Sequence, residues 1–203
     1  MDLKSKIILI SGPTASGKSK LALKIAKKIN GEIINADSMQ VYKELKILTA
    51  RPSEIDLKKI EHHLYGFRTV KKDFSSGEWL KLAKKNIKKI RDKNKIPVLV
   101  GGTGLYFKAL TDGLVKIPNI PISFRNKIRQ MQISLGQKKF YSKLLKNDSL
   151  VKNRIDPTDL QRSIRAYEVI SFTKKSIFEW YKKTKPSFRN DQFIKIYIDY
   201  PRD

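Results

Sequence analysis

The chain has 203 residues and a formal net charge of +25, from 44 lysines and arginines against 19 aspartates and glutamates. A hydrophobic fraction of 40% is typical of a globular protein and excludes a disordered one, and no apolar run is long enough to span a bilayer. The absence of cysteine excludes disulfides, thiolate metal sites and a cysteine nucleophile. We therefore expect a cytoplasmic protein without membrane association.

The basic excess has two explanations. Such a field attracts polyanions, above all nucleic acid, but a chain rich in lysine, isoleucine and asparagine also fits the codon bias of an AT-rich genome. Residues 116–190 carry 18 basic and five acidic side chains and are the denser part. If a polyanion binds, this segment is the better candidate for the contact.

The first 115 residues alternate between strand and helix patterns. Residues 6–10 (KIILI) predict a buried strand, and an apolar face from Leu21 to Ile29 predicts a helix behind it. Residues 31–38 (GEIINADS) and 96–104 (IPVLVGGTG) are further strand candidates. Before the latter lies a basic helix whose expected apolar stripe is Leu80, Ala83, Ile87 and Ile90. This alternation predicts a doubly wound α/β core with a parallel sheet.

The pattern changes at Lys116. After a proline-broken stretch, helical patterns continue to about residue 185, and one of these helices is expected to begin with Asp156 as N-cap and Pro157 in its first turn. Strand character returns in residues 192–199 (QFIKIYID). We predict an α/β core from residues 1–115 and 190–203, interrupted by a helical insertion over residues 116–189.

One glycine-rich motif indicates phosphate binding. Gly12, Gly17, Lys18 and Ser19 satisfy G-x-x-x-x-G-K-[ST] between a strand and a helix. Glycines let successive backbone N–H groups point at phosphate oxygens, and the helix N-terminus adds its positive dipole end. The lysine supplies a charge, and the serine hydroxyl is placed to ligate Mg²⁺. The motif predicts a site for a di- or triphosphate.

A P-loop kinase usually holds Mg²⁺ through a second carboxylate at a strand end. The strand over residues 96–100 ends in glycines and threonine, so Asp37, at the carboxyl end of the strand candidate in residues 31–38, is the available acid. It has three roles open to it: metal ligand, structural helix cap, or general base facing the substrate.

Six motifs together resemble one family. GPTASGKS, NADSMQVYK, TARPS, HHL, VGGTGLYFKAL and RIDPTDLQRSIRAYEV occur in the order found in tRNA dimethylallyltransferases, and the resemblance covers residues 7–203. It implies a P-loop NTPase-like parallel sheet core with an inserted helical domain. It also implies transfer of the prenyl group of dimethylallyl diphosphate to N6 of the adenine 3′ of the anticodon in tRNA, with Mg²⁺ as cofactor. We expect a monomer.

The resemblance assigns roles residue by residue. Asp37 is implied as the base that takes the amine proton, with Thr103 and Lys18 at the reacting centre and Mg²⁺ on Ser19. The diphosphate-binding residues are Gly12, Pro13, Thr14, Ala15, Ser16, Gly17, Lys18 and Ser19. The implied tRNA contacts are Asp37, Ser38, Met39, Gln40, Thr103, Arg125, Gln161, Arg162, Ser163, Ile164 and Arg165. For the last helix, a solvated polar stripe with an Arg165–Glu168 pair is the alternative.

Three features depart from the family or invite another interpretation. His62 and His63 lack a third ligand at zinc-like spacing, which favours a structural or RNA-proximal role. Leu48 stands where the family usually has glycine. The sequence ends in DYPRD, where the family continues into a further helical segment, so we expect an exposed apolar face where that segment would dock.

Two other functions stay open. A small-molecule P-loop kinase would transfer phosphate from ATP, with Asp37 as its metal ligand. A non-catalytic remnant would bind tRNA without forming product. Prenyl transfer to a free adenine nucleotide is disfavoured by the basic helical insertion.

Overall fold

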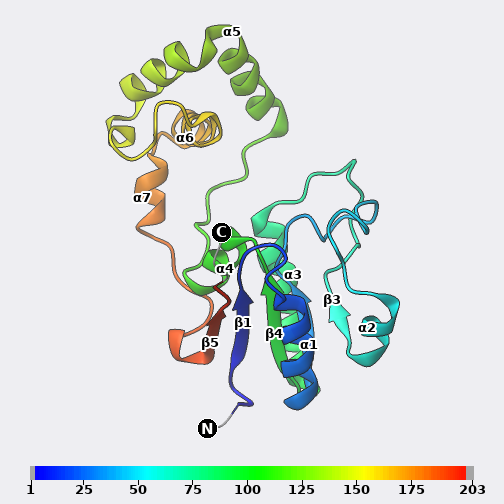
Figure 1. The fold of residues 1–203 in the computed structure, drawn as a ribbon. Helices are drawn as coiled ribbons and strands as arrows, with labels where there is room; N and C mark the ends of the chain where they lie inside the picture. The colour runs from blue at the N-terminus through cyan, green and yellow to red at the C-terminus, as the bar shows by residue number, and fades with distance from the viewer. Residues whose placement is uncertain (1–2, 200–203) are drawn as a thin grey trace. The chain divides into compact units, whose positions relative to one another are not determined.

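The computed structural model describes residues 3–199 and divides into two compact units. Unit 1 comprises Met1–Gly113 and Pro186–Asp203, and unit 2 comprises Leu114–Lys185 (Figure 1). The second boundary precedes the predicted one because Phe188 packs on Phe193 and the Ser187 hydroxyl accepts a hydrogen bond from Lys84, all within unit 1. Residues 200–203 of the predicted core lie outside the described residues.

Unit 1 is built on a five-stranded parallel sheet in the order β3-β2-β4-β1-β5. The strands are β1 (Ile7–Ser11), β2 (Gly31–Asn35), β3 (His62–His63), β4 (Ile96–Gly101) and β5 (Phe193–Tyr197). Strands β1, β2 and β4 are almost wholly buried, which explains their continuous apolar sequences. The predicted α/β fold with a parallel sheet is confirmed.

Helices cover both faces of this sheet (Figure 1). Helix α1 (Lys18–Lys28) packs Ala22 and Ala26 against one face, and α3 (Ser76–Asp92) and α4 (Gly104–Thr111) cover the other. The short helix α2 (Glu54–Lys59), β3 and α4 had no counterpart among the predicted elements. The predicted apolar stripe of α3 included Leu80, which is partly exposed. Trp79 is fully buried and belongs to the buried face of the helix instead.

Unit 2 is helical, with α5 (Ile122–Asn147), α6 (Leu160–Thr173), α7 (Ile177–Tyr181) and a short 3₁₀ turn at Ser149–Val151. A second 3₁₀ turn, Asn190–Gln192, belongs to unit 1. Helix α5 is kinked at Gly136, whose φ of 71° is left-handed. The predicted start of α6 is wrong: Asp159 is the N-cap and accepts from Arg162 N–H, while Asp156 accepts from Thr158 N–H in the preceding turn.

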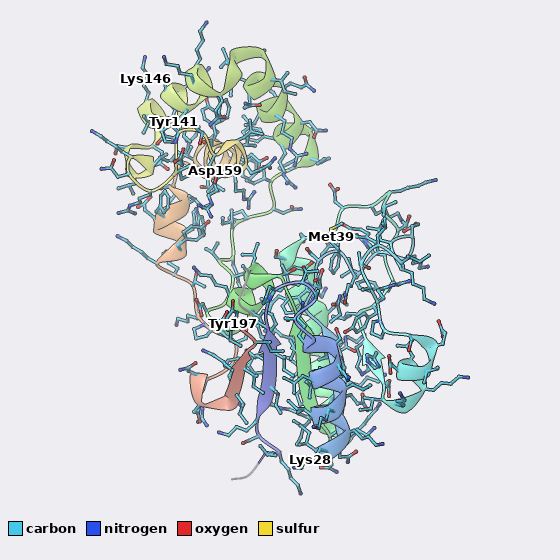
Figure 2. The ribbon with its side chains drawn as sticks, viewed as in Figure 1. Lys28, Met39, Tyr141, Lys146, Asp159 and Tyr197 are labelled. Atoms are coloured by element: carbon cyan, nitrogen blue, oxygen red, sulfur yellow. The ribbon has the colours of Figure 1, made fainter. Side chains whose placement is uncertain are left out.

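The last strand of the sheet, β5, leaves apolar surface at its side. Tyr197, labelled in Figure 2, has 69% of its surface exposed, and a hollow of about 220 Å³ lined by Leu9, Phe107 and Ile196 opens beside it. Within residues 3–199, no helix is both long and apolar enough to cross a membrane.

Candidate active site at the carboxyl end of the sheet

The loop between β1 and α1 presents donors without acceptors. Ala15 and Gly17 have left-handed φ angles of 64° and 78°, a combination that turns backbone N–H groups to one side. Helix α1 starts without a side-chain cap and without an acidic residue in its first turn. The Ser16 hydroxyl is buried and has no hydrogen-bond partner. Unmatched donors at a helix N-terminus are the features of an anion site.

Two side chains complete this loop. The Lys18 ammonium donates to the Pro13 carbonyl across 2.7 Å and is thereby held over the loop. Ser19 is exposed in the first turn of α1 and lines a cavity of about 420 Å³. The cavity has an apolar wall that includes Leu23 and Ile33. A polar mouth and an apolar wall suit a small molecule that carries a diphosphate.

Asp37 lies just beyond β2, and the side chain of Asn35 fixes its backbone. The fully buried Asn35 amide donates to the carbonyls of Asp37 (2.9 Å) and Leu64 (3.1 Å), and its oxygen accepts from Asp37 N–H (2.9 Å). The indole N–H of Trp79 in turn donates to the Asn35 carbonyl. The position of Asp37 is therefore set by the strand end and not by a flexible loop.

The carboxylate of Asp37 lies beside Gly102, in the segment between β4 and α4. One oxygen accepts from Met39 N–H at 2.9 Å, and among residues 3–199 Asp37 makes no ion pair. The Thr103 hydroxyl accepts from Ser38 N–H (2.9 Å) and donates to the Ser38 hydroxyl (3.2 Å). The contact between Ser38 and Thr103 joins residues that are 65 positions apart in sequence. It thereby brings Thr103 beside the segment that carries Asp37.

Gly101 makes this approach possible. A Cβ at this position would collide with the backbone carbonyl of Ala36, so β4 can end beside β2 only with glycine there. The GGTG sequence carried a signal for this close contact, because glycine inside a strand often marks an approaching backbone.

The other predicted residues of unit 1 have different surroundings. Met39 is half exposed, and Figure 2 shows it at the opposite end of unit 1 from Lys28, the last residue of α1. The Gln40 amide donates to the Thr49 carbonyl at 2.8 Å and is therefore already used within the unit. Leu48, which stands where the family usually has glycine, is exposed. The residue in this segment with a left-handed φ angle is Ala50.

In unit 2, the predicted tRNA-contact residues of α6 lie in two different environments. Ser163 is fully buried and accepts a hydrogen bond from Gln137, and Ile164 is buried in the core of the unit. Their side chains point inward because α6 buries that face, so neither offers an exposed side chain to a ligand. Gln161, Arg162 and Arg165 remain accessible.

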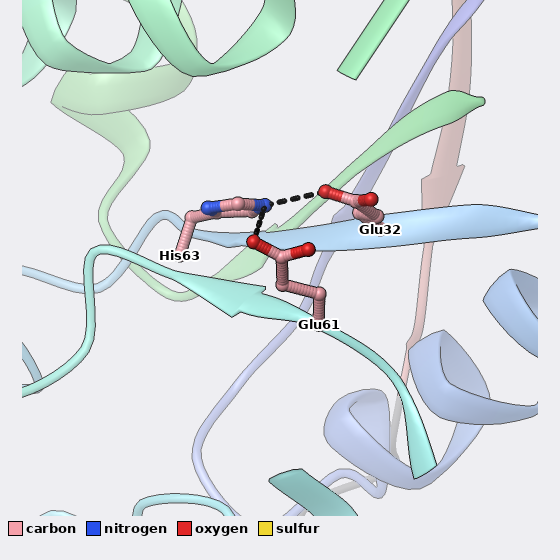
Figure 3. A group of neighbouring side chains, drawn as sticks. All are labelled: Glu32, Glu61 and His63. Carbon is pink, nitrogen blue, oxygen red and sulfur yellow. Dashed lines mark hydrogen bonds and ion pairs between the residues drawn. The ribbon is translucent and has the colours of Figure 1, made fainter. Parts of the chain in front are cut away.

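The two histidines have separate environments, because neighbouring strand residues point to opposite faces. His62 Nδ1 lies 2.7 Å from the Ile60 carbonyl, and its ring packs edge-on against Tyr65. His63 Nε2 lies 2.7 Å from buried Glu32 and 3.8 Å from Glu61 (Figure 3). The sequence spacing indicated no third ligand, but the fold places the carboxylates of Glu32 and Glu61 beside His63.

Lysines nevertheless fill the role that a metal would have in this cluster. Lys93 and Lys95 lie 3.1 Å and 2.9 Å from Glu32, and Lys93 also pairs with Glu61. Burial would raise the pKa of Glu32, but hydrogen bonds from Lys95, His63 and Lys93 hold it at about 2. The cluster is a neutralised ion network at the amino end of β2, away from the phosphate-binding loop.

A glycine-rich loop follows β1, a hydroxyl follows the adjacent strand β4, and a fixed carboxylate follows β2 on the other side of β4. Together with the parallel sheet, this arrangement defines a P-loop-like α/β protein. Residues 40–203 match the model of the IPP transferase family. The chain belongs to this family, as the resemblance implied.

Individual relatives agree. The chain is 62% identical to the tRNA dimethylallyltransferase of Pelagibacter ubique (strain HTCC1062) over all 203 residues, which are 65% of that protein. It is 46% identical to the enzyme of the same name from Rickettsia conorii, over 95% of this chain and 53% of that protein. The chain thus spans between about half and two thirds of the length of these curated relatives.

Solved structures share the fold. A eukaryotic dimethylallyltransferase acting on tRNA is 29% identical, with a TM-score of 0.81 over 95% of this chain and 48% of that chain. The tRNA delta(2)-isopentenylpyrophosphate transferase of Staphylococcus epidermidis is 33% identical, with a TM-score of 0.52 over 91% of this chain and 62% of that chain.

Proposed function

We propose that the protein transfers a dimethylallyl group from dimethylallyl diphosphate to N6 of the adenine 3′ of the anticodon in tRNA, releasing diphosphate. The observation that carries the proposal is the Asp37 carboxylate: it is fixed at a strand end, free of any ion pair among the described residues, and set beside the Thr103–Ser38 contact. Family membership and the names of the relatives support the same reaction.

The loop of residues 12–19 would bind the diphosphate. The uncapped start of α1, the buried Ser16 hydroxyl without a partner and the Lys18 ammonium supply donors for it. Negative charge grows on the diphosphate oxygen as its bond to the allylic carbon breaks, and fixed donors stabilise that charge. The exposed Ser19 hydroxyl suits Mg²⁺, an ion that prefers oxygen ligands and would neutralise part of the diphosphate charge when bound.

Asp37 would act as the general base. The N6 lone pair of adenine is delocalised into the ring, so the amine is a weak nucleophile until its proton is removed. As the new C–N bond forms and the allylic C–O bond breaks, the N6 proton passes to the free Asp37 oxygen. The Thr103 hydroxyl and the half-exposed Met39 would line the place of the base.

An adenine in the anticodon loop must leave its stack to reach such a site, which costs least in a loop that is already unpaired. Ser38, Met39 and Gln40 of unit 1 would lie near the displaced base. Gln161, Arg162, Arg165 and Arg125 of unit 2 would contact other parts of the RNA, and their positive charge suits its phosphates.

The test is a single-turnover incubation of the protein with unmodified tRNA, Mg²⁺ and labelled dimethylallyl diphosphate. Asp37→Ala is compared with Asp73→Ala, which removes an exposed carboxylate elsewhere in unit 1. We expect label on RNA for the wild type and Asp73→Ala but not for Asp37→Ala. A parallel incubation with labelled ATP tests the kinase alternative.

Two outcomes would contradict the proposal. Transfer or hydrolysis of ATP phosphate without prenylation would identify a kinase. Binding of tRNA without labelling by any variant would identify a binding protein without transferase activity.

A further inference from the structure

A buried carboxylate lies beneath two arginines of unit 2. Glu168, on α6, has a side chain that is only 2% exposed. Carboxylates are rarely buried to this extent unless they are paired, because removing the charge from water costs several kcal/mol. The pair that the sequence suggested as a solvated surface contact is therefore anchored in the interior.

Glu168 binds an arginine from each of two helices. Arg165, one turn earlier on α6, donates through Nη1 to Glu168 Oε2 across 3.1 Å. Arg125, on α5, has its Nε 3.4 Å from the same oxygen and 3.5 Å from Oε1. The carboxylate thus joins residues 40 positions apart in sequence, and the three groups together keep one net positive charge.

Both arginine side chains are partly exposed to solvent. The side chains of Arg125 and Arg165 are 37% and 42% exposed, whereas that of Glu168 is buried. A guanidinium has five N–H donors in a rigid plane, so the edge that binds Glu168 leaves further donors free. A carboxylate that holds one edge also fixes the direction in which the free donors point.

An aromatic side chain lies near Arg165, one of these two arginines. Tyr181, at the end of α7, is half exposed and packs edge-on against Phe178. Burial raises the pKa of Tyr181, while the positive charges of Arg165 and Arg162 act in the opposite direction, which places the three residues within electrostatic reach. Arginines beside an exposed ring are typical of surfaces that bind unpaired RNA.

We propose that Glu168 is a positioning residue for RNA binding, which orients the free donors of Arg125 and Arg165 toward tRNA phosphates. The proposal rests on the proposed function for its ligand. It predicts that removal of a negative charge weakens the binding of a polyanion. In the opposite model, Glu168 competes with phosphate for the arginines, so loss of its charge would tighten the binding of tRNA. A simple increase in net positive charge predicts tighter binding as well.

The test measures binding of fluorescently labelled unmodified tRNA by anisotropy, in the absence of dimethylallyl diphosphate, at several salt concentrations. For Glu168→Gln we expect Kd to rise about fivefold to thirtyfold, the effect of misplacing one or two charge-assisted contacts. The slope of log Kd against log salt should fall by about 1 to 2. An unchanged or lower Kd would overturn the proposal.

Matched variants separate positioning from charge and from folding. Asp191→Asn removes one negative charge from an exposed arginine pair in unit 1 and should leave Kd unchanged or slightly lower. In an Arg125→Ala, Arg165→Ala background, Glu168→Gln should have no further effect on Kd. A further loss there, equal to that in the wild type, would show that Glu168 acts only on the fold.

Lysine replacements keep the test valid if Glu168→Gln does not fold. Arg125→Lys and Arg165→Lys preserve the charge but lack the planar fork, so each should raise Kd severalfold. Equal binding by these lysine variants would overturn the proposal. If neither the wild type nor any variant binds tRNA, the proposed function is contradicted instead. For Glu168→Gln, the KM for tRNA should rise, while the rate of prenylation at saturating tRNA should stay unchanged.

Discussion

The two ends of strand β2 each carry a carboxylate, and their surroundings are opposite. Glu32, at the amino end, is fully buried and contacts Lys93, Lys95 and His63. Asp37, just past the carboxyl end, is partly exposed and accepts one backbone hydrogen bond. Both acids lie at an end of the same strand, so position at a strand end does not by itself make an acid reactive. What differs is whether neighbouring cations have already satisfied its charge.

This contrast has a physical origin. At the amino end, Lys93 and Lys95 come from the turn between α3 and β4 and reach the carboxylate of the adjacent strand. At the carboxyl end, the Asp37 carboxylate accepts from Met39 N–H, which orients it without neutralising it. The Asn35 amide and the Thr103 hydroxyl hold the backbone of Asp37 and Ser38 beside it. A carboxylate whose charge is not already matched by cations is the better candidate for a base, and Asp37 has that environment.

Asparagine at position 37 should produce the largest effect. The amide oxygen in Asp37→Asn still accepts from Met39 N–H, so the fold and tRNA binding should persist, but the proton acceptor is gone. We expect the single-turnover rate of prenyl transfer to fall about 10²- to 10⁴-fold, the usual contribution of a general base. Rapid-quench kinetics measures this, with Glu32→Gln as the control that keeps its rate. An equal fall of the single-turnover rate in Asp37→Asn and Glu32→Gln would show that the two carboxylates do not differ in function.

Glutamine at position 32 should act on stability and not on rate. Because the pKa of Glu32 is about 2 in the folded protein against 4.5 in the unfolded one, its charge stabilises the fold above pH 4.5. The contribution is about 3 kcal/mol, and it is lost as the pH falls from 4.5 toward 2. Urea unfolding at pH 7, 4.5 and 3 should show a lower, flatter profile for Glu32→Gln. A wild-type pH dependence in the variant would refute this assignment.

Asn35→Ala should affect the rate less than Asp37→Asn. It removes the amide that bonds to both backbone groups of Asp37 and to Leu64, so the base loses its fixed position but not its chemistry. We expect kcat to fall about tenfold, with the KM for tRNA unchanged. Asn35→Ser, which can still bond to Asp37 N–H, should recover part of the rate. A change confined to KM would point to a role in binding instead.

The smallest effect should come from an exposed pair. Arg189 and Asp191 lie 3.0 Å apart with side chains 81% and 60% exposed. Water already solvates both charges, so Asp191→Asn should change the free energy of unfolding by no more than about 0.5 kcal/mol. Urea titration at neutral pH measures it. A loss similar to that of Glu32→Gln would mean that burial does not explain the behaviour of Glu32.

Local sequence was sufficient for the features that depend on local rules. The spacing of Gly12, Gly17 and Lys18 between a strand and a helix predicts a phosphate-binding loop, and the apolar runs of β1 and β4 predict the buried parallel sheet that the structure has. The start of α6 was misplaced because Asp156 and Asp159 are equally good caps by sequence. Only the turn at Pro157–Thr158 decides between them.

Other features depended on residues that are distant in sequence. The amino-acid sequence by itself determined the α/β class, the loop and the candidate base Asp37. The tertiary structure decided that Asn35 holds Asp37, that Glu32 meets His63 and two lysines, that Ser163 and Ile164 face inward, and that Glu168 joins Arg125 to Arg165. Hydrogen bonds and ion pairs act over a few ångströms in space, whereas sequence patterns report only which face of a strand or helix a residue occupies.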